Sequence, residues 1–311
     1  MVNARLRKER PLTDPTDAQA IQQALAARFG ETLAVDPEID GLETLRRMAS
    51  RRVHRRYLDR PVDPALLRLL CACALSSPSK SDLQQGDIVI VADPAKRRAI
   101  FDLIPSMPWM MEAPVFLVFC GDGQRLPRIS ALRGKPFPND HLDAFFNAAV
   151  DGAIVMTSFI AAAEAVGLGC CPISVVRNHC EVLRDVLALP PRVVPIAGLC
   201  VGWPMTPGRL SPRLSIDARV HVDRYDADSL EARLDEYDRR RAGVEPSTRQ
   251  RDADRWGEVP FYGWSEDKAR QYAEPQRTDF GAFVRAQGFN LDWRGAASLP
   301  SSGMGGEMYP G

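Results

Sequence analysis

The segment FFNAAVDGAIVMTSFIAAAEAVGLG, residues 145–169, is the most apolar part of the 311-residue chain and decides how the rest can fold. Its length approaches that of a membrane span, but Asp151 and Glu164 interrupt it and small residues dominate it. A helix over 141–166 that protein buries on nearly all sides fits this composition better. In an enzyme such a helix often lies at a subunit interface, and we expect no membrane contact.

Shorter apolar runs on both sides of this helix predict a sheet. Strands are expected at 87–92, 115–120, 167–173 and 193–201. Further helices are expected at 18–29, 42–48, 66–75, 94–101, 181–187, 230–241 and 280–288. Because these elements lack a regular βαβ rhythm and no glycine fingerprint follows the first strand, a Rossmann dinucleotide site is not indicated. The prediction is an α+β fold over 40–225, with a sheet flanked by helices.

The flanking segments differ in composition from this domain. Residues 1–39 are expected to form a loose leader and one helix, and 226–294 a C-terminal extension that is irregular and polar over 243–275. The stretch 121–139 is expected as an excursion containing Gly, Pro and Arg, and 295–311 as a disordered tail.

Charge and cysteine content exclude several classes of protein. The chain contains 40 Lys+Arg and 40 Asp+Glu residues, so its formal net charge is zero. A nucleic-acid-binding protein normally carries a basic excess, and we expect no such partner. The seven cysteines lie in or beside apolar stretches, which favours reduced thiols in the cytoplasm over a disulfide framework. Neither they nor the four histidines show metal-ligand spacing, so no metal site is expected.

Two basic or polar segments near the N-terminus could bind a ligand. RRVHRRY at 51–57 places four arginines and a histidine within seven residues, and guanidinium groups match phosphate oxygens well. On composition alone, a solvated basic helix end is an equally good interpretation. SSPSKSDLQQ at 76–85 offers hydroxyls, a lysine and two amides to a polar heterocycle. Taken alone, it is better interpreted as an ordinary surface loop.

Two later segments could join the same site. In GLGCCPISVVRN at 167–178 the chain leaves the buried helix and re-enters the core, so backbone N–H groups could face a ligand. The adjacent Cys170 and Cys171 are interpreted as buried, inert thiols. PGRLSPRL at 207–214 could return one or two guanidinium groups to the anion site. Each segment is weak evidence alone, and their order along the chain is what carries information.

Taken in order, these segments resemble the flavin-dependent nitroreductase family over roughly residues 40–290. The Arg-Arg-Ser-x-Arg-x-Phe-type motif of that family corresponds to 51–57, and its Pro-Ser-x-x-x-Leu-Gln-type loop to 78–84. A Gly-Leu-Gly turn with a Pro-Ile segment follows at 167–175, and Gly-Trp-Pro and Pro-Arg-Leu segments close the series. The chain looks most similar to the NADPH-preferring, oxygen-insensitive members.

The resemblance implies a central, mainly antiparallel sheet in an intertwined homodimer, with FMN at each subunit interface. The residues implied for the FMN phosphate are Arg51, Arg52, Ser211 and Arg213. Those implied to reach in from the partner subunit are Ser79, Lys80 and Ser81, with Gln84 supporting their loop. Those implied to line the isoalloxazine, with backbone N–H toward N5, are Pro172, Ile173, Ser174 and Val175. Arg55 would lie near the N1/C2 edge of the ring.

Three positions depart from the family pattern. Val53 replaces the usual Ser and removes a hydroxyl donor to phosphate, and Ser211 stands where Lys is common. Met107 falls where a polar amide often contacts the pyrimidine edge of the flavin. One missing donor weakens binding by about 1 kcal/mol, which reduces FMN affinity without abolishing it.

The implied reaction passes a hydride from NADPH through flavin N5 to an electron-poor acceptor such as a nitroaromatic or quinone, with ping-pong kinetics. Arg55 would stabilise negative charge at N1 of the reduced ring. The C-terminal extension would shape the entrance for substrate and NADPH. There Arg241 and Arg277 match the nicotinamide-phosphate region by position, although a solvated helix face is an equally good interpretation. NADH as the reductant, a specialised ring substrate, and passive flavin binding stay open as alternatives.

Overall fold

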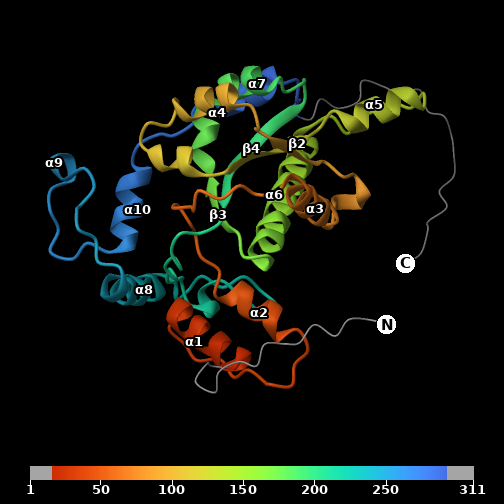
Figure 1. Cartoon of the computed structure of the whole chain (residues 1–311). Coiled ribbons are helices and arrows are strands. Elements are labelled where there is room, and N and C mark those ends of the chain that lie inside the picture. The colour runs from red at the N-terminus through yellow and green to blue at the C-terminus, as the bar shows by residue number, and fades with distance from the viewer. Residues whose placement is uncertain (1–15, 293–311) are drawn as a thin grey trace, which may run out of the picture.

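The computed structural model describes residues 16–292, in which helices cover both faces of one sheet (Figure 1). The predicted leader over 1–15 and the predicted tail over 295–311 lie outside the described residues. The strands are β1 (Gly86–Ile90), β2 (Val115–Asp122), β3 (Gly169–Ile173) and β4 (Val193–Gly202). The α-helices are α1 (Asp17–Phe29), α2 (Leu42–Ala49), α3 (Pro64–Leu75), α4 (Pro94–Phe101), α5 (Arg125–Leu132), α6 (Leu142–Ala165), α7 (Cys180–Leu187), α8 (Leu230–Val244), α9 (Ala253–Trp256), α10 (Trp264–Tyr272) and α11 (Phe280–Ala286). The short 3-10 helices are η1 (Lys80–Asp82), η2 (Pro108–Glu112), η3 (Ser174–His179) and η4 (Ile216–Ala218).

The sheet has the strand order β1-β2-β4-β3, and each neighbouring pair is antiparallel. This confirms the predicted α+β class and the antiparallel sheet. β1 and β3 are the outer strands, so the chain segments that precede them lie at opposite edges of the sheet.

Alternating side chains of β2 divide the hydrophobic core between the two faces of the sheet. Phe116 and Val118 pack with Phe101 of α4 and with residues of α7 and η2. Leu117 lies on the other face and packs with Phe159 of α6 and with residues of α3. The sheet is therefore buried on both faces and forms the middle layer.

Local signals set several helix boundaries. Thr16 and Gln19 form a reciprocal capping box at the start of α1. Asp63 and Asp93 cap α3 and α4, and each precedes a proline at the first helical position, where no backbone donor is needed.

The long helix α6 confirms the element predicted at 141–166 and packs along β1 and β2. Its buried residues are Ala144, Ala148, Asp151, Gly152, Val155, Phe159, Ile160 and Ala163. On its other side Phe146 is 60% exposed and Leu142 is 54% exposed. The expected burial on nearly all sides is therefore wrong within one chain, because only one stripe meets the protein core. Within residues 16–292, α6 is the one helix long and apolar enough to cross a membrane, judged by length and composition alone.

Three helices occupy segments that were expected to be irregular. α5 lies within 121–139, and α9 and α10 lie within 243–275. Polar contacts hold α10 in place: the buried Asp238 accepts the backbone N–H of Ser265 at 3.0 Å, and the buried Arg270 donates to two backbone carbonyls at 2.9 Å. Such tertiary contacts leave no apolar periodicity in the sequence, which explains the error.

Candidate functional site

The arginine-rich stretch 51–57 is extended chain lying beside β3, rather than a helix end. Val53 forms a parallel bridge with Cys170, and the backbone N–H of His54 donates to the Cys170 carbonyl at 3.1 Å. Farther along, the N–H of Leu58 donates to the Trp203 carbonyl at 2.8 Å. Backbone pairing to β3 and to the end of β4 therefore fixes the arginines, and the alternative of a solvated helix end is wrong.

Arg51 and Arg52 carry buried donors without a partner among the described residues. The Nε of Arg51 pairs with Oε1 of Glu164 on α6 at 3.3 Å, but Arg51 Nη2 and Arg52 Nε have no hydrogen-bond acceptor. Burial raises the pKa of the Glu164 carboxyl, an effect that the neighbouring Arg51 partly offsets. Unpaired buried donors are destabilising, so an anion that accepted from them would complete the arrangement.

The loop 207–214 folds back onto this stretch, as its sequence predicted. Gly208 has φ +72°, and a Cβ atom there would lie 2.9 Å from the ring of His54. A Cβ at Gly169 would lie 2.7 Å from the same ring, so two glycines make room for the imidazole. Burial, reinforced by Arg52, lowers the pKa of His54.

Arg213 follows on the same loop and acts electrostatically on Arg28 of α1, as do Arg51 and Arg52. Three arginines from two other segments therefore lie close enough to Arg28 for their charges to act on it. We call Arg28, Arg51, Arg52 and Arg213 the arginine cluster. The sequence predicted three of its members and missed Arg28, because nothing in α1 distinguishes a buried arginine from a surface one.

Arg55 lies near groups from β3 and η2. Its guanidinium is 6.0 Å from the centroid of the Trp109 ring. Burial raises the pKa of the Cys171 thiol, and interaction with Arg55 partly offsets this shift. Met107 precedes η2 and packs against the core. The aromatic and apolar surroundings of Arg55 differ from the polar surroundings of Arg51.

The Pro-Ile segment joins β3 to η3 and presents side chains alternately. Pro172 and Ser174 are exposed, Ile173 is buried, and Val175 is half-buried. Asn178, at the end of the same turn, accepts a hydrogen bond from Arg277 at 3.1 Å. Arg277 is therefore the predicted extension residue that reaches this segment.

The loop that contains Ser79, Lys80 and Gln84 is tied to the middle of α6 by Asp151. This buried carboxylate accepts hydrogen bonds from the Ser79 hydroxyl at 2.7 Å, the Lys80 N–H at 3.2 Å and the Gln85 N–H at 3.0 Å. Ser81, Asp82 and Gln84 all have positive φ values, between 50° and 55°. Such backbone is unfavourable for residues other than glycine, so the anchor holds a strained loop in one shape.

Within a single chain, this loop lies far from the arginine cluster. Asp151 anchors the loop and Glu164 contacts Arg51, and the two acids lie thirteen positions apart on α6. At 1.5 Å of rise per residue the separation is about 20 Å along the helix axis. The loop also precedes β1, whereas the arginines lie beside β3 at the opposite edge. The structure therefore does not bring Ser79–Ser81 of one chain to its own Arg51 and Arg52.

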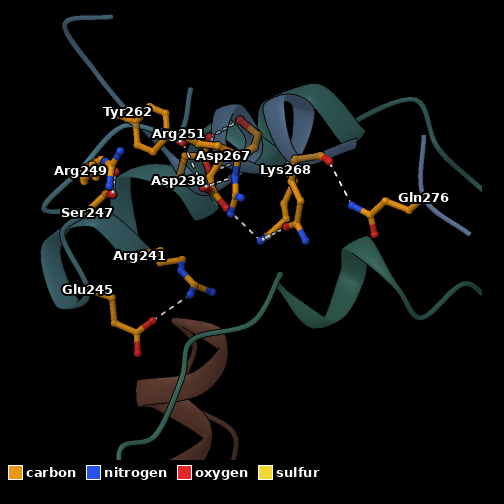
Figure 2. Close-up of polar contacts among 12 residues, drawn as sticks. Asp238, Arg241, Glu245, Ser247, Arg249, Arg251, Tyr262, Asp267, Lys268 and Gln276 are labelled. Carbon is orange, nitrogen blue, oxygen red and sulfur yellow. Dashed lines mark hydrogen bonds and ion pairs between the residues drawn. The ribbon is translucent and has the colours of Figure 1, made fainter. Parts of the chain in front are cut away.

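Cations of the C-terminal extension are mostly paired with acids. Figure 2 shows Arg241 reaching Glu245, with 2.9 Å between Nη2 and Oε2, and Lys268 near Asp267. Arg241 also donates to the hydroxyl of Tyr237 at 2.8 Å. Arg241 contacts Tyr237 of α8 and Glu245, the residue that follows α8, whereas Arg277 contacts Asn178 of η3. Within residues 16–292 no group of three His, Cys, Asp or Glu side chains could hold a metal ion.

Comparison with known proteins gives the class that this fold and site define. Residues 48–107 and 105–203 match the Nitroreductase family, and residues 211–292 match the Nitroreductase family, C-terminal domain. The chain therefore belongs to the nitroreductase family.

Individual relatives agree with this assignment. An oxygen-insensitive NADPH nitroreductase of Salmonella typhimurium is 33% identical over 198 residues, which are 62% of this chain and 80% of that protein. An FMN reductase [NAD(P)H] of Bacillus subtilis is 33% identical over 200 residues, 63% of this chain and 80% of that protein. Among solved structures, B. megaterium NfrA2 superposes with a TM-score of 0.72 at 29% identity, covering 80% of this chain and 99% of that one.

Proposed function

We propose that this chain is an FMN-dependent NAD(P)H oxidoreductase that reduces an electron-poor small molecule such as a nitroaromatic or a quinone. The observation that carries the proposal is the pair of buried, unpartnered donors on Arg51 and Arg52 within the arginine cluster. Relatives named FMN reductase and oxygen-insensitive NADPH nitroreductase support the choice of cofactor and reductant.

The arginine cluster fits the phosphate monoester of FMN. Arg51 Nη2 and Arg52 Nε would donate to its oxygens, and charge-assisted hydrogen bonds of this kind are about twice as strong as neutral ones. Arg213 and the Ser211 hydroxyl lie on the loop that closes over His54 and would complete the phosphate site. Val53 offers no donor, and its side chain instead packs against the core.

The flavin ring would lie along the segment from Pro172 to Val175, whose exposed positions face away from the core. Arg55 interacts with the thiol of Cys171, which directly precedes this segment, and it would hold negative charge at the N1 edge. When bound, FMN supplies the hydride chemistry between NAD(P)H and the acceptor, so no protein acid or nucleophile is required. Met107 would meet the pyrimidine edge with an apolar contact.

A second copy of the chain would complete the site. The loop with Ser79, Lys80 and Ser81 is held about 20 Å from the arginine cluster of its own chain along α6. The uncovered side of α6, with Phe146 60% exposed, offers an apolar surface for a partner. We therefore propose a homodimer in which this loop, supported by Gln84, reaches the FMN of the other subunit.

The C-terminal extension would form the entrance and bind the reductant. Arg277 contacts Asn178 beside the proposed ring segment, which supports a role for Arg277 in binding NADPH. Arg241 would have to exchange its contact with Glu245 for the 2′-phosphate, so its contribution should be smaller. NADH would lack that phosphate and depend on neither arginine.

The acceptor could also be a free flavin or a specialised ring, and the protein could bind flavin without turnover. We propose a cytoplasmic location, because all seven cysteines are free thiols. An absorbance scan of the purified protein, before and after FMN is added, tests the cofactor. Anaerobic NADPH should then bleach the yellow protein, whereas a passive flavin binder would stay yellow. A preparation that FMN cannot turn yellow would remove the proposal.

A further inference from the structure

Arg28 is a buried arginine on α1, with only 8% of its surface exposed. The family matches begin at residue 48, so α1 lies outside the residues that define the family. Figure 1 shows α1 beside α2 and α8, at the end of the sheet where the arginine cluster lies. From this position a side chain of α1 can contact the backbone of the residues proposed to bind the phosphate.

The guanidinium of Arg28 donates to backbone carbonyls on both sides of the phosphate site. Its Nη2 donates to the carbonyl of Arg51 at 2.7 Å, and its Nη1 to the carbonyl of Ser211 at 3.2 Å. Its Nε and Nη2 also contact the carbonyl of Ala49, at 3.3 and 3.2 Å. One side chain therefore connects the extended stretch to the loop 207–214.

The backbone of Arg28 makes a second connection to the same loop. Its carbonyl accepts the N–H of Arg213 at 2.6 Å and the Nη1 of Arg240 at 2.9 Å. Arg240 in turn donates to the carbonyl of Arg213. The end of α1 and the start of the Arg213 segment are therefore locked together.

The charges around Arg28 are unbalanced. Burial, followed by the charges of Arg213, Arg51 and Arg52, lowers the pKa of Arg28, and the carboxylate of Glu164 opposes this shift. Bringing four guanidinium groups together against one carboxylate is unfavourable unless an anion balances them. A phosphate monoester, which carries close to two negative charges at neutral pH, would do so.

We propose that Arg28 is a positioning residue of the FMN phosphate site, holding Arg51 and the Ser211–Arg213 segment in place and adding a positive charge behind them. This inference rests on the proposed FMN function. It also explains how the site can bind phosphate although Val53 has no donor and Ser211 has no charge. In this chain α1, which precedes the residues that match the family, supplies what those two positions lack.

Binding of FMN and riboflavin to the apoprotein tests the inference, because riboflavin has the same ring without the phosphate. In Arg28→Met we expect the Kd for FMN to rise about tenfold and the Kd for riboflavin to change less than about twofold. Arg28→Lys keeps the charge but loses the forked donors, so it should raise the Kd for FMN by an intermediate factor and leave the Kd for riboflavin unchanged. This variant replaces Arg28→Met in the test if Arg28→Met does not fold. Arg46→Met is the matched control, because Arg46 joins α2 to α1 through Asp17 at 2.8 Å without touching the phosphate site.

Three results would overturn the inference. An unchanged Kd for FMN in Arg28→Met would show that Arg28 does not support the phosphate site. An equal rise in both dissociation constants would make Arg28 an ordinary structural residue. A wild-type apoprotein that binds neither flavin would overturn the proposed function itself and this inference with it.

Discussion

Cations of the arginine cluster and cations of the C-terminal extension differ in what they already bind. Arg51 and Arg52 are half-buried and retain donors that find no acceptor within residues 16–292. Arg241 and Lys268 are paired with Glu245 and Asp267 at 2.9 Å each. We propose that the first region binds an anion, whereas Arg241 and Lys268 in the second are already paired with acids.

This difference indicates where binding energy should come from. A donor that is already desolvated and unpaired gains a full charge-assisted hydrogen bond when phosphate arrives. A cation that must first leave a carboxylate gains only the difference between two similar interactions. Binding of the FMN phosphate should therefore depend strongly on the arginine cluster. Binding of the NADPH 2′-phosphate should depend only weakly on cations of the extension.

Removing a member of the arginine cluster should have the largest effect. Arg52→Met deletes an unpartnered buried donor and its charge, which should weaken FMN binding by about 2 kcal/mol, or roughly 30-fold in Kd. Fluorescence titration of the apoprotein measures this. Arg239→Met, an exposed arginine on α8, is the control and should leave the Kd unchanged. Equal effects of the two substitutions would erase the contrast between the regions.

Releasing the loop should have the next largest effect. Asp151→Asn replaces one carboxylate oxygen by an amide nitrogen that cannot accept, either the Oδ2 that accepts from both Ser79 and Gln85 or the Oδ1 that accepts from Lys80. Loss of either anchor should raise the Kd for FMN about tenfold. Asp143→Asn, at the exposed start of α6, is the matched control. If Asp151→Asn lowered the Tm but left FMN affinity intact, the loop would not take part in the site.

Substitutions in the extension should separate the two reductants. Arg277→Ala should raise the KM for NADPH about fivefold, because a partly exposed charge–phosphate contact is modest in strength, while the KM for NADH stays constant. Arg241→Ala should have a smaller effect, since Glu245 already neutralises Arg241. Steady-state kinetics with both reductants measures this, and equal effects on the two KM values would exclude a 2′-phosphate role.

Restoring a donor at Val53 should strengthen FMN binding. Val53→Ser would add one hydroxyl beside Arg52 and should lower the Kd about fivefold, equivalent to about 1 kcal/mol. Val53→Thr keeps the branched shape and is the control for lost packing. A weaker affinity in both variants would mean that packing of Val53 against the core matters more than the missing donor.

Acid should destabilise the apoprotein slightly through His54. The folded-state pKa of His54 is lowered, so below its ordinary value of about 6.5 the unfolded chain takes up a proton that the fold resists. The free energy of unfolding should therefore fall as the pH drops from about 7 toward 5. The Tm measured across this pH range should fall less in His54→Gln than in the wild-type protein. If Tm fell equally with pH in both proteins, the prediction would be wrong.

The sequence was informative where local patterns decide the outcome. Apolar runs located the four strands, and the order of motifs led to the arginines beside β3. Helix α10 was missed because tertiary polar contacts, such as that of Asp238, stabilise an element without a strong apolar periodicity. The sequence could not show that Arg28 turns inward, since its contacts lie about 20 and 180 residues away.

Asp151 and Glu164 illustrate the same limit. Both were noticed as interruptions of an apolar segment, which counted against a membrane span, but neither was assigned to the site. In the structure one anchors the loop of Ser79 and the other contacts Arg51. Charged residues in the buried stripe of a core helix are a signal that could have identified them.

A mixed dimer tests most directly whether two distant regions form one flavin site across subunits. Chains with Arg52→Met and chains with Asp151→Asn, each weakened in FMN binding, are unfolded together and refolded, and the FMN that binds with the wild-type Kd is counted. If the loop of one chain serves the arginines of the other, each mixed dimer contains one site with both parts intact, and tight FMN binding should return at one FMN per mixed dimer. If both parts of a site came from the same chain, every site would keep one defect, and no tight binding would return.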